Sequence, residues 1–425
     1  MPKSNEYSNH HYVPEWYQER FMLPDEHHLY YLDMKPDVFF DPRGVSHQTK
    51  AVRRQGKRMN FAEKHLYTAH INGIARKDIE TIFFGDIDRK AVDAVSYFND
   101  FDYPLKHWKD YYTDFMLYMS TQKLRTPKGL RQLGQKIGTK NRFKVLNALL
   151  QLRGLYCAHW TDCVWSIADA SKSDTKFIIS DHPVTVYNRE YGPRSSACRN
   201  GNDPDIWQEG THTIFPLSLN KVLILTNLSW VRNPYQSAKN LLPNPDPLRD
   251  AIFKFTEIQV RRMLSEEEVR QINFIIKSRA LRYIASAKEE WLYPEKHVSK
   301  SDWSRYGHGY LLMPDPRPIH WGGTIMWGGA KGGRGGAMDE YGRKPWEPGF
   351  EDKKRAEIEY KTLPWFKGEF ARLFGPYRRG ISMSSSVQID NEFDDDEFHK
   401  YHLGLERKSY KERNRPSTER PPTEV

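Results

Sequence analysis

The chain has little of what marks a secreted or membrane protein. It contains three cysteines in 425 residues, Cys157, Cys163 and Cys198, and so sparse and odd a set argues against a disulfide framework. No apolar run approaches the roughly 18 to 20 residues that cross a bilayer. The polar segment from Met1 to Asn9 lacks the apolar core of a secretory signal. These absences predict a cytoplasmic protein with no membrane partner.

Several catalytic motifs are also missing. The sequence has no G-x-S-x-G turn, Walker loop, H-E-x-x-H motif or dinucleotide-binding glycine fingerprint. Cys157 and His159 are two residues apart on a predicted helix, so their side chains point apart and do not indicate a metal site. Serine hydrolase, nucleotide-hydrolysing and zinc-protease functions are therefore without support in the sequence.

Acidic residues are absent from Phe115 to Thr161, although this stretch carries nine positive charges. The net charge of the whole chain is +10, so the positive charge of this stretch nearly equals the excess of the whole chain. A basic field of this kind attracts phosphates and other anions. Alternatively, the stretch packs against the acidic segment from Asp78 to Asp93 and binds nothing. The nine cations are Lys123, Arg125, Lys128, Arg131, Lys136, Lys140, Arg142, Lys144 and Arg153.

Helical and strand-like patterns occupy different parts of the chain. Apolar spacing predicts helices over 77–98, 110–124 and 140–165, the last with a break near Gly154. Segments of β-like composition follow between 177 and 226, and a capping box from Ser265 to Glu268 starts another helix. Because strands and helices do not alternate regularly, we predict an α+β fold rather than a doubly wound sheet. Its helix-rich N-terminal half packs with a mostly antiparallel sheet.

Composition divides the chain into three parts. Residues 8–290 form the predicted α+β domain. Residues 300–380 are rich in Gly and Trp and lack a phosphate-loop motif, which predicts an irregular extension, a candidate contact for a protein partner. Residues 381–425 combine an acidic run with a basic tail rich in Pro and Thr, and we predict that they are mostly disordered.

One polar turn near the start, together with six further segments in a defined order, resembles a known family. The first turn is His10-His11-Tyr12-Val13-Pro14, and the ordered set is similar to the bacterial domain of unknown function family 4238 over about residues 8–287. The segments that follow the first turn are Ala62 to Thr68; Ile79-Glu80 with Ile87-Asp88; Gln122-x-x-Arg125-Thr126-Pro127; Phe177 to Val184, which contains the second turn Ser180-Asp181-His182-Pro183; Phe215 to Ser218; and Ile272-Asn273 leading to Arg282-Tyr283-Ile284.

The resemblance implies an α+β domain in which the first turn lies near the Ser-Asp-x-Pro turn. The family has no established activity to carry over. Asn usually follows the aspartate in this family, whereas here the residue is His182. His11 fits the family pattern more firmly than His10 does. The resemblance therefore favours His11 and Asp181 as site residues and makes His10 and His182 local additions.

We predict that His11, Glu80, Arg125 and Asp181 share one pocket. A histidine nitrogen with two carboxylates is a reasonable ligand set for a divalent metal, so the tentative metal ligands are His11, Glu80 and Asp181. The same three groups can instead act as catalytic acid and base without a metal. The leading hypothesis is a phosphate-directed, nuclease-like hydrolase that acts on nucleic acid or a nucleotide.

In this hypothesis, residues at the end of a predicted helix bind the substrate. Gln122 and Arg125 are three apart and share a face, where the guanidinium can clamp a phosphate. Lys123 and Lys128 add positive charge nearby.

The same residues also suit structural roles. Asp181 in a Ser-Asp-x-Pro turn can cap backbone amides, and Arg125 can form a buried ion pair with Glu80. The protein would then be a non-enzymatic nucleic-acid or protein-binding module. The sequence leaves both interpretations open.

Overall fold

The computed structural model describes residues 9–71, 74–76, 83–101, 108–232 and 258–299, together with 324–327, 336–339 and 346. The chain divides into two compact units, one of Met1–Asn227 with Gln259–Tyr310 and one of Leu228–Ile258 with Leu311–Val425. The predicted extension at 300–380 and the tail at 381–425 lie almost entirely outside the described residues. In the described part, each helix is too short or too polar to cross a membrane.

The fold is α+β, as the order of sequence patterns predicts. A five-stranded sheet has the order β11-β12-β13-β9-β14, in which only β14 runs parallel to its neighbour β9. Every residue of β11 and β12 is buried, so both faces of this sheet are covered. The strands are β9 (Val164–Asp169), β11 (Thr185–Asn188), β12 (Thr211–Pro216), β13 (Lys221–Thr226) and β14 (Gln259–Met263).

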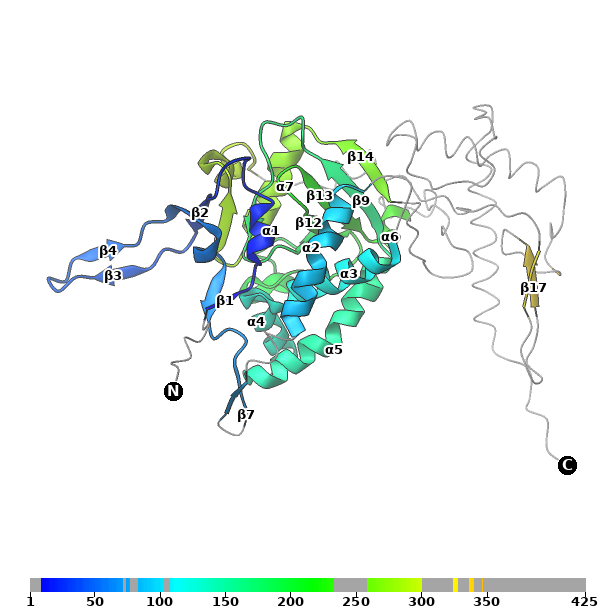
Figure 1. Ribbon diagram of the computed structural model, residues 1–425, viewed down its shortest axis with the longest axis horizontal. Helices are drawn as coiled ribbons and strands as arrows, with labels where there is room; N and C mark the ends of the chain where they lie inside the picture. The colour runs from blue at the N-terminus through cyan, green and yellow to red at the C-terminus, as the bar shows by residue number, and fades with distance from the viewer. Residues whose placement is uncertain are drawn as a thin grey trace. The chain divides into compact units, whose positions relative to one another are not determined.

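A layer of helices packs against this sheet (Figure 1). The helices are α2 (Gly85–Asn99), α3 (Trp108–Arg125), α4 (Pro127–Lys136) and α5 (Arg142–Thr161). The rings of Phe98 on α2 and Phe115 on α3 lie 5.7 and 6.1 Å from Trp165 on β9, which joins this layer to the sheet. The predicted break near Gly154 is wrong, because α5 passes through that residue without interruption.

Local capping signals explain where several helices begin. Thr126 accepts the Gly129 N–H and Pro127 occupies the first turn of α4, where its missing N–H costs nothing. Gly129 is required because a Cβ there would collide with the carbonyl oxygen of Lys123. The predicted Ser265–Glu268 capping box is confirmed at the start of α7 (Glu266–Arg279).

A second, four-stranded antiparallel sheet has the order β10-β15-β2-β5. It brings segments from both ends of the first unit together, because β2 from the N-terminal part pairs with β15 from the C-terminal part. Its strands are β2 (Leu29–Asp33), β5 (Val52–Gln55), β10 (Ile179–Ser180) and β15 (Tyr283–Ser286).

Short elements complete the described residues. A hairpin of β3 (Val38–Phe40) and β4 (Ser46–Gln48) projects away from the rest of the first unit (Figure 1). The others are β1 (Asn9–His11) paired with β6 (Ala62–Lys64), β7 (Ala69–Ile71) paired with β8 (Ile74–Arg76), β16 (Thr324–Trp327) paired with β17 (Gly336–Asp339), α1 (Glu15–Glu19), α6 (Leu228–Arg232), and the 3₁₀ turns η1 (Lys57–Met59), η3 (Ser196–Gly201), η5 (Glu289–Leu292) and η6 (Pro294–Lys296).

Candidate functional site

The two polar turns approach each other through Tyr12 and Asp181. Burial raises the pKa of Tyr12 well above its usual value, and the Asp181 carboxylate is among the charges that raise it further. Asp181 follows β10 and is buried. Its oxygens accept the backbone N–H groups of residues 281, 282 and 283 at 2.8, 2.7 and 2.8 Å. Asp181 therefore ties the segment between α7 and β15 to the end of β10, as the structural alternative predicts.

The other two members of the predicted metal trio are placed differently. His11 Nε2 lies 3.2 Å from the carbonyl oxygen of Arg58 and 3.8 Å from Glu15 Oε1. In the described part of the chain, no hydrogen bond or ion pair joins His11 to Asp181, and no group of three or more His, Cys, Asp or Glu is placed to hold a metal ion. Glu80 lies outside the described residues, so the complete trio stays a prediction.

Arg125 forms a buried structural ion pair rather than an open phosphate clamp. Its guanidinium is 1% exposed and donates to both Asp88 oxygens at 2.8 and 2.9 Å. Arg125 Nε also donates to Gln122 Oε1 at 2.8 Å, and Gln122 Nε2 donates to the Tyr12 carbonyl oxygen at 2.7 Å. These bonds fasten α3 to α2 and to the first polar turn. For Arg125, therefore, the basic stretch does pack against the acidic segment.

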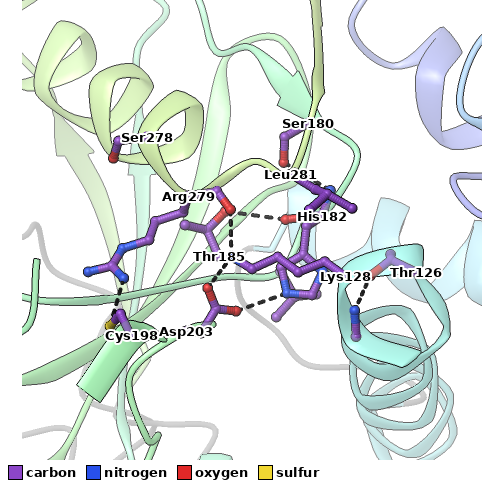
Figure 2. A network of polar contacts seen from close by, with 12 residues as sticks. Thr126, Lys128, Ser180, His182, Thr185, Cys198, Asp203, Ser278, Arg279 and Leu281 are labelled. Carbon is purple, nitrogen blue, oxygen red and sulfur yellow. Dashed lines mark hydrogen bonds and ion pairs between the residues drawn. The ribbon is translucent and has the colours of Figure 1, made fainter. Parts of the chain in front are cut away.

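Lys123 and Lys128 converge on a carboxylate that is remote in sequence, Asp203. Figure 2 shows Lys128 and His182 beside Asp203. Lys123 forms an ion pair with Asp203 Oδ2, and Lys128 Nζ lies 2.5 Å from Oδ1. His182 completes the cluster, since its Nε2 lies 3.0 Å from Asp203 and its Nδ1 lies 2.6 Å from Thr126 Oγ1. The side chains of Lys123, Lys128, His182 and Asp203 are all less than 5% exposed. We call these four residues the buried charge cluster.

Positive charge exceeds negative charge in and around this cluster. Arg279 lies beside it and donates to the Tyr191 carbonyl oxygen and to Cys198 Sγ. Burial lowers the pKa of Lys123 to about 8 despite its ion pair with Asp203. Burial alone would raise the pKa of Asp203, but the two lysines outweigh it and hold that pKa well below its usual range. Asp203 is therefore the counter-ion on which both buried lysines depend.

Thr126, His182 and Asp203 form a row of hydroxyl, imidazole and carboxylate, like the catalytic groups of serine hydrolases. Thr126 is fully buried, and its oxygen already caps α4 by accepting the Gly129 N–H at 3.1 Å. None of the three side chains lines the pocket described below. The row therefore serves to connect α4 with the turn after β10 and with the loop that contains Asp203.

The buried imidazole makes a testable contribution to acid stability. Burial, and then the charge of Lys123, lower the pKa of His182 from 6.5 to about 3, so in that window only the unfolded chain binds its proton. Stability therefore falls as the pH drops. In His182→Gln, we expect the slope of unfolding free energy against pH, between roughly pH 4.5 and 6, to be shallower by up to about 1.4 kcal/mol per unit. Urea unfolding at several pH values measures this, and equal slopes would contradict it.

A pocket of about 520 Å³ opens among α4, α5 and β6, on the basic stretch. Arg131, Lys140 and Arg142 line it, and none has an ion-pair partner among the residues that the structure describes. Glu63 is the one acid in the lining, and burial raises its pKa although Arg142 opposes the shift. The apolar part of the wall consists of Leu66, Pro127, Leu130 and Val145, and the remaining lining residues are Gly134, Gln135, Gly138 and Thr139.

The loop that delivers Asp203 also borders this pocket. Gly201 has a φ of +71°, and a Cβ there would lie 3.3 Å from Arg131 Nη2. Asn202 Nδ2 donates to Gln135 Oε1 at 3.0 Å, and Gln135 lines the pocket. Residues 201–203 thus connect the basic pocket with the buried charge cluster.

Sequence reasoning missed part of this arrangement. The family resemblance makes His182 a local addition, yet the structure places it at the centre of the cluster. Asp203 carried no signal, because it stands in a polar Asn-Gly-Asn-Asp-Pro loop that reads as an ordinary turn. Lys123 and Lys128 were predicted to contact substrate, but both are buried against Asp203.

Fold and site together define an α+β protein with a buried ion network beside a basic pocket. Residues 142–290 match the model of a family described as protein of unknown function, DUF4238. The match confirms the family resemblance over α5, the five strands of the larger sheet, β10, β15 and α7, and its range includes Asp181, His182 and Asp203. Residues before 142 and the C-terminal region lie outside it. Comparisons with curated proteins and with solved structures found no match.

Proposed function

We propose that the protein binds a phosphate-bearing ligand, a nucleotide or a nucleic acid, in the pocket between α4 and α5. The observation that supports this proposal is the presence of three unpaired cations, Arg131, Lys140 and Arg142, around one concave site. The pocket volume of about 520 Å³ lies within the usual range for sites that hold small ligands. Its apolar wall suits a sugar or base, and its cations suit the phosphate.

The distribution of charge along the basic stretch supports the same conclusion. Lys123 and Lys128 both form ion pairs with Asp203, Arg125 forms one with Asp88, and Arg153 lies 4.6 Å over the ring of Phe83. The remaining five cations have no ion-pair partner within the described ranges: Arg131, Lys136, Lys140, Arg142 and Lys144. Unpaired charges of one sign raise the local concentration of anions and speed their association. The pocket lies within this unpaired group.

A binding role agrees better with the described geometry than hydrolysis does. Asp181, the central carboxylate of the hydrolase hypothesis, already accepts three backbone N–H groups. Arg125 and Lys128, assigned to substrate there, are buried in ion pairs. Hydrolysis by His11, Glu80 and Asp181 stays a prediction, as do a cytoplasmic location and a protein partner for residues 300–380.

Fluorescence anisotropy with a labelled oligonucleotide, and competition with a mononucleotide, test the proposal. We expect the double variant Arg131→Ala/Arg142→Ala to bind at least about tenfold more weakly, because it removes two phosphate contacts. The slope of log affinity against log salt concentration should also fall by about one for each contact removed.

Lys172→Ala is the matched control, because Lys172 is an exposed lysine that does not line the pocket. Its affinity and salt slope should equal those of the wild type. The proposal fails if the double variant binds as the wild type does, or if Lys172→Ala weakens binding equally, because binding would then depend on net charge alone.

A further inference from the structure

The β3–β4 hairpin exposes large apolar side chains. Val38, Phe39 and Phe40 are 57%, 53% and 71% exposed, and all six residues of its two strands are exposed. The hairpin projects from the first unit, so solvent reaches both of its faces (Figure 1). Exposed clusters of this kind mark interaction sites more often than isolated surface residues do.

The hairpin holds its rings in a defined arrangement. Asp41 Oδ1 accepts the backbone N–H groups of Arg43 and Val45, each at 2.9 Å, and so shapes the turn. Phe39 lies opposite His47 across the two strands, with ring centroids 5.5 Å apart and an interplanar angle of 24°. A ligand that stacks on Phe39 would therefore find that ring already ordered by His47.

A second basic region without acids begins after Asp41 in the hairpin turn and continues through β5. No Asp or Glu occurs from Pro42 to Ala62, a segment with six Lys and Arg residues. Lys57 and Arg58 lie near Glu15 or Glu19. The other four are exposed and have no ion pair among the described residues: Arg43, Lys50, Arg53 and Arg54. Arg53 and Arg54 belong to β5, the edge strand of the four-stranded sheet.

We propose that the β3–β4 hairpin and β5 form a binding surface for single-stranded nucleic acid. Unpaired bases stack on Phe39 and Phe40, and the phosphates are neutralised by the four unpaired cations. Aromatic platforms beside a positive strip are the chemistry by which single strands are held without sequence preference. This surface is separate from the α4–α5 pocket, and the inference does not rest on the function proposed for that pocket.

Two other occupants fit the observations less well. Insertion into a membrane would carry Asp41 and Arg43 in first, because both lie in the turn at the tip, and charges are costly in hydrocarbon. Pairing of the hairpins of two copies would bring the same four unpaired cations face to face, where they repel one another. Single-stranded nucleic acid satisfies the rings and the cations together.

Anisotropy with labelled single-stranded and duplex oligonucleotides of one sequence tests the inference. We expect the wild type to prefer the single strand and the full-length Phe39→Ala/Phe40→Ala variant to lose about tenfold in single-strand affinity. Phe40→Tyr, which keeps an aromatic face, should retain wild-type affinity. Because both rings are exposed, unfolding of the alanine variant should match that of the wild type.

Mononucleotide competition separates this surface from the pocket. The hairpin variant should bind mononucleotide unchanged, and loss of pocket binding in Arg131→Ala/Arg142→Ala would leave the hairpin effect intact. Equal single-strand affinity in the alanine variant and the wild type would overturn the inference. Two other results would also overturn it if the phenylalanine substitutions left single-strand binding unaffected. These are sedimentation of the wild type with phosphatidylserine vesicles and a dimer that the substitutions abolish.

Discussion

Asp203→Ala should lower the free energy of unfolding by roughly 3–5 kcal/mol, the usual cost of leaving buried charges without their partner. Lys123 and Lys128 are each at most 3% exposed and share this one carboxylate. His182 would lose its contact with Asp203 as well. Urea unfolding followed by circular dichroism at neutral pH measures the change.

Two further variants separate charge from simple loss of contacts. Asp205→Ala alters an exposed aspartate in the same loop and should change stability by less than about 1 kcal/mol. Adding Lys128→Met to Asp203→Ala should restore part of the loss, because it removes one uncompensated buried charge. An Asp203→Ala protein as stable as Asp205→Ala would show that the cluster does not depend on its carboxylate.

Asp181→Ala should cost roughly 2–4 kcal/mol, since it removes a carboxylate that accepts three backbone N–H groups, and bonds to a charged acceptor are among the stronger ones. The bonds reach residues 281, 282 and 283, about a hundred positions away along the chain. Without them only the backbone pairing of β10 with β15 holds the end of β10 to this segment. The loss should appear in urea unfolding and as faster hydrogen exchange in residues 281–286.

Asp181→Asn keeps the shape but turns one acceptor into a donor, so it should be destabilised nearly as much as Asp181→Ala. Asp93→Ala is the control, because Asp93 is exposed on α2, and it should stay within about 0.5 kcal/mol of the wild type. If Asp181→Ala left stability and exchange unchanged, the capping role would be wrong and a role in chemistry would gain weight. A nuclease assay on Asp181→Ala is informative only together with these stability measurements, because lost activity could otherwise reflect unfolding.

Local sequence signals were sufficient to predict the fold class and the start of one helix. The capping box at Ser265 acts within three or four residues, so a single sequence displays it in full. The separation of helical and strand-like segments was likewise sufficient for an α+β fold. The break expected near Gly154 failed because one exposed glycine costs α5 only about 1 kcal/mol, less than the packing around it supplies.

The candidate site depended on pairings between distant residues. Lys123 and Asp203 are 80 positions apart, and Arg125 and Asp88 are 37 apart. A lone charged residue in a sequence looks the same whether it faces solvent, substrate or a buried counter-ion. Lys128 was therefore expected at a substrate and lies against Asp203, and Asp181 was expected at a metal and caps a turn.

By itself, the sequence determined the α+β class, the family resemblance and the acid-free basic stretch between 115 and 161, because composition, spacing and caps are local properties. Only the tertiary structure decided which of the nine cations in that stretch form ion pairs and which remain unpaired around the pocket. The physical reason is that a charge is satisfied by whatever the fold brings within a few ångströms, and the sparse cysteines and absent motifs said nothing about that.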